Sequence, residues 1–447
     1  MFEDRSQTSC DTAIVGGGVA GLTAAAYLVR GGESVIVLEK SRICGGRART
    51  RNHDGFQFNQ GPHALYLAGE AHRTLKDLQV PFTGAGPREG WALVGGRPYP
   101  LPRSLSSIWK SRLFSLQGKW SVTRFLTRLG RIDFEQIASL GLADWLAGQI
   151  SDRRAREFAA ALFRLATYAT DQRRLSAGAA VDQLRLALHG VLFLDGGWQT
   201  IVDGLLRDVQ TRGGRVQAGR RVAAIDRDEE AIQLRLADGG QIACRRLVLA
   251  TAPEAVAELV PEAAPHVVGG ADHPPVLAAC LDVALRRLPE PRQLFFLGID
   301  RPVYASVHSA AAKLAPGDAA LVHVLKYLDR PATDSAAIEQ ELESLLDQFQ
   351  PGWRSELVER RYLPNMRVVE RLPSAAGGGL QGRPAVALPN CDNIYLAGDW
   401  VGATGMLADA SFASGRRAAE LILAQRSQRP QLHATRGGPT RRGEPVC

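Results

Sequence analysis

Three glycines in the pattern G-x-G-x-x-G are the residues of this sequence whose spacing points most directly to chemistry. They are Gly16, Gly18 and Gly21. In this pattern the first glycine permits a tight turn, the second lets a phosphate approach the backbone, and the third lets a helix pack closely on a strand. Glu39 follows where an acid accepts hydrogen bonds from the hydroxyls of an adenosine ribose. The pattern therefore predicts a site for a dinucleotide that lacks a 2′-phosphate.

The elements that must position these glycines can be read from the surrounding pattern. Residues 13–29 form an uncharged run that is almost long enough to cross a membrane. However, a short apolar run ends at Gly16 as a buried parallel strand would, and a second one covers residues 34–39. We therefore expect strand, helix and strand. The helix N-terminus at Val19 and Ala20 would present free N–H groups and a positive dipole end to the phosphates.

The residues after Glu39 indicate which dinucleotide is bound. Gly45-Gly46-Arg47 adds a second glycine turn with a cation, and the whole stretch resembles the FAD-binding fingerprint of the amine oxidase, protoporphyrinogen oxidase and phytoene desaturase superfamily. Residues 56–65 are similar to the family's segment beside the isoalloxazine ring. Residues 196–206 resemble the glycine pair and helix that re-enter its FAD domain, and residues 393–423 resemble its C-terminal motif. The closest resemblance in character is to the phytoene desaturase-like members.

The resemblance implies roles for single residues. Val222 would contact the adenine through its backbone, and Asp399 would hydrogen-bond the ribityl chain. A helix starting near Met406 would direct its N-terminus at the N1–C2=O edge of the flavin and stabilise the anionic reduced ring. The implied cofactor is non-covalently bound FAD, and the residues implied to bind it are Gly16, Gly18, Val19, Ala20, Gly21, Glu39, Lys40, Gly46, Arg47, Val222, Gly398, Asp399 and Met406.

The expected fold class is α/β. It combines a Rossmann-type, GR2-like FAD-binding domain with an inserted substrate domain of mixed β-sheet plus a helical lobe. The expected segments are 1–85, 195–275 and 385–425 for a discontinuous FAD-binding domain, 86–194 for the helical substrate lobe, 276–384 for the substrate-domain sheet, and 426–447 for a disordered basic tail.

The composition excludes several classes of protein. A content of 45% hydrophobic and 22% charged residues is ordinary for a soluble globular protein. The net charge is +8, but the arginines are scattered and no nucleic-acid module is visible, so we expect no nucleic-acid partner. The six cysteines form no CxxC or metal-type cluster, which favours free thiols and no metal site. The N-terminus has no apolar core of a signal peptide, so we expect a cytoplasmic protein.

One basic stretch has two interpretations. Residues 90–132 contain no acid. A basic helical face covering the substrate lobe is the first interpretation, and peripheral contact of 97–131 with the anionic inner face of a membrane is the second. The basic residues are Arg97, Arg103, Lys110, Arg112, Lys119, Arg124, Arg128 and Arg131, and the apolar residues between them are Leu101, Ile108, Trp109, Leu113, Phe114, Trp120, Phe125 and Leu126.

The type of oxidation depends on residues that the chain lacks. Amine oxidases of the superfamily usually carry a lysine near flavin N5 on a substrate-domain strand, and an aromatic residue just before the last helix. The corresponding strand, 274–285, has no lysine, although Lys326 lies on another predicted strand, and residues 404–406 include no aromatic. We therefore expect desaturation of an apolar substrate, isoprenoid or another secondary metabolite, by hydride transfer to flavin N5.

The polar group that assists this step is the least defined part of the prediction. His63 is the candidate catalytic residue, because it could donate to a flavin carbonyl or move a proton. A structural histidine is the alternative, and Trp198 and Tyr66 are cavity walls or simple core residues. Since one nucleotide-binding unit is visible, we expect oxygen or a quinone-type electron acceptor. An amine or amino-acid oxidase stays open, as does a flavin-free prenyl-binding protein similar to Rab escort proteins, which intact Glu39 and Asp399 disfavour.

Overall fold

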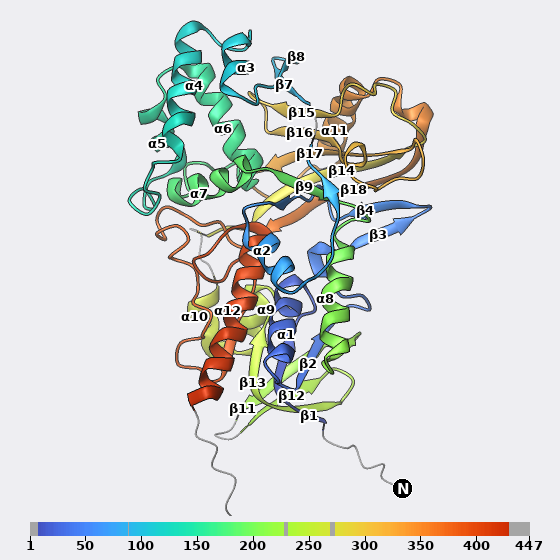
Figure 1. Cartoon of the computed structure of the whole chain (residues 1–447), viewed down its shortest axis with the longest axis vertical. Helices are drawn as coiled ribbons and strands as arrows, with labels where there is room; N and C mark the ends of the chain where they lie inside the picture. The colour runs from blue at the N-terminus through green and yellow to red at the C-terminus, as the bar shows by residue number, and fades with distance from the viewer. Residues whose placement is uncertain (1–7, 88, 228–230, 269–272, 429–447) are drawn as a thin grey trace, which may run out of the picture.

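The computed structural model describes residues 8–87, 89–227, 231–268 and 273–428. Two seven-stranded sheets dominate it (Figure 1). One lies in the lower part of the view in Figure 1, and the other lies in the upper part, beside a group of helices. The predicted α/β class, with a Rossmann-type domain, a mixed substrate-domain sheet and a helical lobe, is confirmed.

The first sheet is the mostly parallel one. Its strands are β1 (Thr8–Val15), β2 (Val35–Glu39), β10 (Arg215–Ala218), β11 (Val222–Arg227), β12 (Ile232–Leu236), β13 (Gln241–Leu249) and β19 (Ile394–Leu396). The order is β10-β2-β1-β13-β12-β11, and β19 pairs in parallel with β13. β1 lies between β2 and β13, parallel to both, so the glycine turn that follows it opens at the carboxyl edge of the sheet, where α/β folds bind ligands.

Helices pack around this sheet. They are α1 (Val19–Arg30), α2 (Glu70–Asp77), α8 (Gln199–Thr211), α9 (Pro253–Leu259), α10 (Ala264–Val267) and α12 (Leu407–Gln428). α1 and α12 lie side by side (Figure 1), and their approach is close at one glycine. A Cβ added at Gly415 would lie 2.3 Å from the backbone oxygen of Ala20, so this crossing requires glycine. The C-terminal helix is therefore held against the helix that follows the glycine turn.

The central strands of the second sheet are buried on both faces, whereas its edge strands are partly exposed. Its strands are β7 (Trp91–Val94), β8 (Arg97–Pro100), β14 (Val276–Leu285), β15 (Phe295–Gly298), β16 (Val303–Val307), β17 (Ala320–Leu328) and β18 (Leu357–Val369), in the order β18-β14-β17-β16-β15-β7-β8. α11 (Ser335–Phe349) covers one face with Leu342 and Leu346. The other face packs on the helical lobe and on Phe56 and Phe58, so every residue of β14 is buried.

The helical lobe and the short strands complete the fold. The lobe contains α3 (Leu105–Lys110), α4 (Leu116–Leu129), α5 (Leu142–Gln149), α6 (Arg153–Thr167) and α7 (Ala177–Leu188). The short strands are β3 (Thr50–His53), β4 (Phe56–Asn59), β5 (Leu65–Tyr66), β6 (Gly84–Ala85) and β9 (Val191–Leu194). The β7–β8 hairpin, which falls in the segment predicted as the lobe, pairs with β15 of the second sheet. The domain boundaries themselves stay predictions.

The described residues also bear on three smaller expectations. Within them, no helix combines the length and the apolar character that crossing a bilayer requires, and the uncharged run at 13–29 forms the end of β1, the glycine turn and most of α1. All cysteines in the described ranges are free thiols. The predicted tail, 426–447, begins inside α12, which ends at Gln428, and residues 429–447 lie outside the described residues.

Candidate functional site

The glycine turn between β1 and α1 has the geometry of a phosphate cradle. Gly16 has φ +114°, and a Cβ added there would lie 2.2 Å from the backbone oxygen of Ala250. A Cβ added at Gly21 would lie 2.0 Å from the oxygen of Gly16. Gly18, the N-cap of α1, has no atom within 4 Å of an added Cβ and no side-chain cap, so the N–H groups of the first turn face open space. This arrangement fits a pyrophosphate.

Glu39 lies at the end of β2 beside this turn. One carboxylate oxygen accepts the Gly17 N–H at 2.7 Å, and the other accepts the Ser41 N–H at 2.8 Å. Each oxygen keeps a lone pair that could accept a ribose hydroxyl. The Arg220 N–H donates to the backbone oxygen of Glu39 at 2.8 Å, so β11, which begins at Val222, starts near the same strand end. Lys40, the next residue of the chain, is exposed.

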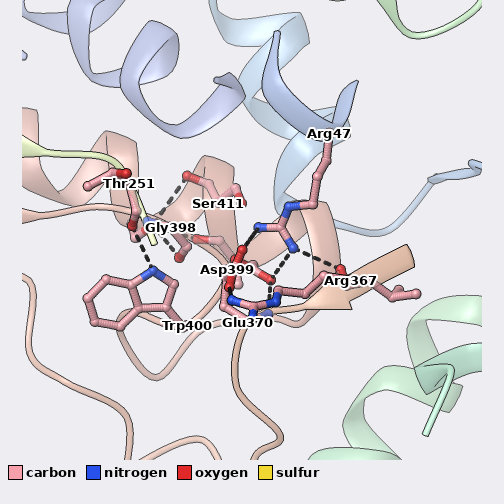
Figure 2. Close-up of polar contacts among 11 residues, drawn as sticks. Arg47, Thr251, Arg367, Glu370, Gly398, Asp399, Trp400 and Ser411 are labelled. Atoms are coloured by element: carbon pink, nitrogen blue, oxygen red, sulfur yellow. Dashed lines mark hydrogen bonds and ion pairs between the residues drawn. The ribbon is translucent and has the colours of Figure 1, made fainter. Parts of the chain in front are cut away.

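An ion pair between an arginine and an aspartate joins two segments that are far apart in the sequence. The Arg47 guanidinium, in the turn after β2, donates to both carboxylate oxygens of Asp399 at 2.6 Å and 3.0 Å (Figure 2). The backbone N–H of Glu370 donates to the same carboxylate at 3.0 Å, and the Glu370 side chain lies 3.7 Å from Arg47. Although burial alone would lower the pKa of Arg47, the Asp399 charge raises it. The sequence predicts each residue at the site but not that they pair.

The segment from Gly398 to the start of α12 includes Asp399 and continues beside its ion pair with Arg47. Trp400 turns its indole N–H away from the pair, toward the backbone oxygen of Thr251 at 3.1 Å (Figure 2). Met406 is buried, and α12 begins at Leu407, next to the predicted start. Leu407 itself has φ +54°, a left-handed conformation that is uncommon outside glycine. The helix N-terminus therefore follows a tightly constrained turn, and its contact with a flavin edge stays a prediction.

His63 lies in the loop that leads from β4 to β5. Its Nδ1 is 3.0 Å from the backbone oxygen of Gly61, and its ring centre is 5.1 Å from that of Trp198, which is buried at the start of α8. Burial lowers the pKa of His63 to about 4, so the ring is neutral at pH 7. A neutral imidazole donates through one nitrogen and accepts through the other. The candidate catalytic role of His63 stays a prediction.

Four buried tyrosines share the space between the helical lobe, the loop at His63 and the second sheet. The rings of Tyr168 and Tyr327 are 5.7 Å apart. The Tyr66 and Tyr168 hydroxyls donate to backbone oxygens, each at 3.2 Å, whereas the Tyr327 hydroxyl is buried without a partner among the described residues. Burial raises the pKa of Tyr304 as well as those of the other three, so all four stay neutral phenols. Tyr304 and Tyr327 lie on β16 and β17 and were not predicted.

Lys326 does not lie on the same side of the second sheet as these tyrosines. It is the residue before Tyr327 on β17, so it points to the opposite face of the sheet. There its ammonium group lies 2.5 Å from Glu341 of α11. The expectation from β14 also holds, because this strand carries no lysine. The titratable residue that β14 does carry is the buried Asp282, which was not predicted.

Comparisons with known proteins agree with this geometry. The family model for flavin containing amine oxidoreductase matches residues 19–423. A phytoene desaturase of Cercospora nicotianae is 35% identical over 120 residues, which cover 25% of this chain and 19% of that protein. A phytoene dehydrogenase of Streptomyces griseus is 26% identical over 270 residues, 53% of each chain. The matched parts thus span between a fifth and about half of these curated relatives.

A solved structure extends the likeness to nearly the whole fold. The crystal structure of an oxidoreductase from Methanosarcina mazei matches 92% of this chain and 100% of that chain, with a TM-score of 0.71 and 19% identity. At this identity the match shows the fold alone. The family match covers most of the chain, begins directly after the glycine turn, and includes Glu39, Arg47 and Asp399. The chain therefore belongs to the flavin containing amine oxidoreductase family and is an FAD-dependent oxidoreductase.

Proposed function

We propose that this enzyme oxidises C–H bonds of a large apolar substrate, isoprenoid or another secondary metabolite, and so introduces a double bond. The observation that carries the proposal is the buried, tyrosine-rich apolar region between the helical lobe and the second sheet, which we call the chamber. Its walls combine neutral tyrosine rings with aliphatic side chains such as Leu325 and Ala278. Apolar surface favours an uncharged hydrocarbon over a strongly hydrated group. The flavin, when bound, supplies the hydride acceptor at N5.

The charges around the chamber support an uncharged substrate over an ammonium ion. Asp282, the buried carboxylate of this face, is paired with Arg361 on one oxygen and His323 on the other. The Arg164 guanidinium lies 5.7 Å from the centre of the Tyr327 ring, so this aromatic face already has a cation. An entering ammonium group would meet two arginines and no free carboxylate on this face of the described structure.

The chain's own residues divide the remaining work. Gly16 and Gly18 hold the pyrophosphate, and Asp399 accepts from the ribityl chain while Arg47 keeps its carboxylate in place. The N-terminus of α12 stabilises negative charge at the N1–C2=O edge. His63, a neutral ring on the other side of this region, serves as a polar contact to the flavin. The names of the two curated relatives, a phytoene desaturase and a phytoene dehydrogenase, support the same class of reaction.

The electron acceptor is proposed to be oxygen or a quinone-type molecule. The family has amine oxidoreductase in its description, so an amine or amino-acid oxidase is the alternative function. The flavin-free prenyl-binding protein that the sequence left open is inconsistent with an FAD-dependent oxidoreductase. The paired state of Asp282 and the position of Lys326 on the far face support the proposal of desaturation over amine oxidation.

Anaerobic bleaching of the flavin tests the choice of substrate. The purified holoenzyme would be mixed without oxygen with polyenes or porphyrinogens, and separately with amines and amino acids. We expect the apolar compounds to remove the visible flavin band and the amines to leave it unchanged. Bleaching by amines together with no response to any apolar compound would contradict the proposal and establish the alternative.

We also propose that the enzyme docks on anionic membranes through α3 and α4, which lie at the end of the molecule farthest from the N-terminus (Figure 1). The acid-free stretch divides into two sets of apolar residues. Phe114 and Phe125 are buried in the lobe, whereas Trp120 is 65% exposed and Leu116 is 72% exposed. Trp109 packs edge-on against Trp120 at 5.3 Å and is itself partly exposed. Exposed tryptophans among exposed arginines suit the headgroup region of a bilayer.

Flotation with lipid vesicles tests this docking. We expect the holoenzyme to float with vesicles that contain phosphatidylserine, to float less as salt increases, and to stay behind with neutral vesicles. The double variant Leu116→Ser and Trp120→Ser should lose flotation. Val358→Ser, which removes an exposed apolar side chain from β18, is the matched control and should float normally. Equal flotation of the double variant would refute the assignment.

A further inference from the structure

A buried row of polar side chains crosses the second sheet on the face that lines the chamber. Asp282 on β14 is in register with His323 on β17 and with Arg361 on β18. His323 Nδ1 lies 2.5 Å from one carboxylate oxygen, and Arg361 Nη2 lies 2.5 Å from the other. The Asp282 and His323 side chains have no exposed surface. Such a row in a hydrophobic sheet is costly unless it has a use, because charges lose their hydration there.

The protonation of this row follows from its contacts. Burial alone would raise the pKa of Asp282, but the neighbouring His323 and Arg361 lower it to about 2. The carboxylate is therefore ionised and can only accept hydrogen bonds, so His323 must donate through Nδ1. Arg361 provides a positive charge that balances Asp282, so the carboxylate does not require a second cation from the imidazole. A neutral ring with its proton on Nδ1 has a bare lone pair on Nε2.

His323 Nε2 is the imidazole nitrogen of this row that forms no hydrogen bond with the described residues, and it is buried. A buried polar atom left unpaired costs about 1–3 kcal/mol. The ring next to it belongs to His308, 4.5 Å away, and His308 Nδ1 is likewise buried without a described partner. Two unpaired imidazole nitrogens on facing rings indicate that a group from outside the chain completes this place.

The other groups that face His323 do not compete with it for protons. Burial lowers the pKa of His308 well below its usual value, and the His308 Nε2 shares a hydrogen bond of 3.0 Å with Tyr304. Cys280 donates its thiol to Asp282 at 3.0 Å, and burial raises the pKa of this thiol. His63, across the chamber, is neutral at pH 7 because of its own burial. Among these imidazoles, His323 is the one whose Nδ1 contacts a carboxylate.

The row also lies where the second sheet meets the segment implied to run beside the flavin ring. Arg361 donates to the backbone oxygen of Asn59, in the strand that leads to this segment. A Cβ added at Gly61 would lie 2.5 Å from the sulfur of Met366 and 3.9 Å from that of Cys280. The sheet and the loop between Asn59 and His63 are thus in contact around the row. A substrate held over the flavin from the sheet side would lie against this face.

We propose that His323 Nε2 is the general base that takes the proton released when the substrate's double bond forms, and that Asp282 is the positioning residue that orients it. This inference rests on the proposed function. One C–H bond of the substrate breaks and its hydrogen leaves as hydride to flavin N5. The C–H bond of the adjacent carbon breaks and its hydrogen leaves as a proton to His323 Nε2. The electron pair of the second bond forms the C=C bond, so atoms and electrons balance.

The charges created by this step compensate each other. Before the reaction the Asp282–Arg361 pair is neutral and the His323 ring is uncharged. Afterwards His323 would be an imidazolium next to a carboxylate, and the hydride given to the bound cofactor would bring a negative charge to the same region. One positive and one negative charge thus form together in the same buried region. Their mutual attraction lowers the cost of making either one away from water.

A metal ion at this place is the competing explanation. The thiol of Cys280, the carboxylate of Asp282 and the imidazole of His323 lie within 4.8 Å of one another and are the metal-type group found in the described residues. However, the Arg361 guanidinium contacts the same carboxylate at 2.5 Å. A divalent cation would have to share this small buried space with that fixed positive charge. The arginine therefore already provides the charge that a metal would bring.

The first test removes the base and keeps the contact that orients it. His323→Asn retains an amide donor toward Asp282 but has no atom at the Nε2 position, and His323→Gln is a second variant in case the first does not fold. The matched control is Lys326→Met, on the same strand but facing α11. Flavin content and flavin reduction by an apolar substrate without oxygen would be measured from about pH 5 to about pH 9, around the usual histidine pKa.

We expect the wild type to lose activity on the acidic side, where a protonated ring cannot act as a base. The His323 variants should keep their flavin but reduce it about 10²- to 10⁴-fold more slowly, without that acidic decrease. Lys326→Met should behave as the wild type. A variant rate within threefold of the wild type, or a wild-type rate that does not change across this pH range, would overturn the proposal. Failure of every apolar substrate to reduce the wild-type flavin would instead refute the proposed function.

The second test does not depend on activity. Long-range nitrogen–proton correlation spectra of holoenzyme labelled with ¹⁵N-histidine show which ring nitrogen carries the proton. We expect one ring, absent from His323→Asn or His323→Gln, to be neutral with its proton on Nδ1 at pH 8. A proton on Nε2 of this ring would overturn the proposal, as would one equivalent of bound metal in the purified holoenzyme by elemental analysis.

Discussion

Replacing Asp399 with alanine is the most direct test of how the chain holds FAD. This carboxylate accepts two hydrogen bonds from Arg47 and one from the backbone N–H of Glu370, and its side chain is only 3% exposed. Removing one partner of a fully buried ion pair costs about 3–5 kcal/mol. Here Arg47 is 41% exposed, so water screens the charge that is left, and Glu370 lies 3.7 Å away and can take over part of the contact. We therefore expect Asp399→Ala to lower the free energy of unfolding by about 2 kcal/mol, which is less than the effect of breaking a fully buried pair.

The loss of FAD affinity comes on top of this loss of stability. A hydrogen bond to the ribityl chain contributes about 0.5–1.5 kcal/mol net, which corresponds to an increase of about 2- to 10-fold in the Kd for FAD. Apoprotein would be titrated with FAD, and binding would be followed by quenching of flavin fluorescence. The thermal midpoint of the apoprotein gives the stability change separately from the affinity change.

Glu370→Gln is the matched control, because it keeps both the Arg47–Asp399 pair and the backbone N–H that donates to Asp399. It should bind FAD as the wild type does. If Asp399→Ala binds FAD with an unchanged Kd and melts at the wild-type temperature, then the pair neither contacts the cofactor nor joins the two ends of the chain. The role assigned to the Arg47–Asp399 pair drawn in Figure 2 would then be wrong.

Two further predictions concern positions near the same cofactor. Gly18→Ala should fold with a wild-type thermal midpoint as apoprotein but fail to retain FAD, because its new methyl group meets no protein atom and occupies the phosphate space; Gly16→Ala should lose thermal stability as well, since its methyl would overlap the Ala250 oxygen. Equal FAD content in Gly18→Ala and wild type, measured by the ratio of flavin to protein absorbance, would contradict the cradle. Burial raises the pKa of Asp409 to about 7, so the native state holds this proton more tightly than the unfolded chain does; the stabilisation is complete below about pH 4 and is lost as pH rises through about 7. Asp409→Asn keeps an acceptor for the Ala71 N–H. It should therefore melt at a higher temperature than the wild type above pH 7 and at nearly the same temperature near pH 4. Thermal melting curves across this range measure the difference, and an equal difference at all pH values would contradict the prediction.

The parts of the site that the sequence predicts are those encoded over short distances. Gly16, Gly18 and Gly21 lie within one turn, and the conformations they require are set by their immediate neighbours. Glu39 ends the next strand, which is parallel to the first, so its place beside the turn follows from the strand–helix–strand unit. The start of α12 was predicted within a residue because residues 393–423 resemble the C-terminal motif of the family, which is itself a continuous local segment. Local chemistry decides each of these features.

The parts that the sequence does not predict depend on pairing between distant segments. Arg47 and Asp399 are 352 positions apart, and no local pattern states that they meet. The row of Asp282, His323 and Arg361 exists only because three strands align in one register. A signal was nevertheless present: Asp282 interrupts the otherwise apolar strand β14 and His323 lies in an apolar run of β17, and polar residues in such positions are seldom buried without a reason.

The basic stretch shows a third kind of limit. Its composition alone does not distinguish a membrane surface from a lobe core, and the structure divides its apolar residues between the buried lobe core and the exposed surface. Helical periodicity separates the two sets, because Phe125 packs inward from α4 while Trp120 of the same helix faces outward. Composition thus identified the segment, but only the helix positions divide its residues into a buried set and an exposed set.

The way the first sheet is assembled has a consequence for how the protein is made. β13 receives its last neighbour, β19, only when residues 394–396 have been synthesised, and α1 is covered by a helix that follows them. Until then, a growing chain has the apolar side of α1 uncovered and a sheet edge unpaired, which invites aggregation and chaperone binding. The helical lobe, whose contacts lie close together along the chain, can fold earlier. Uptake of FAD therefore comes late in biosynthesis, and it separates complete chains from prematurely ended ones.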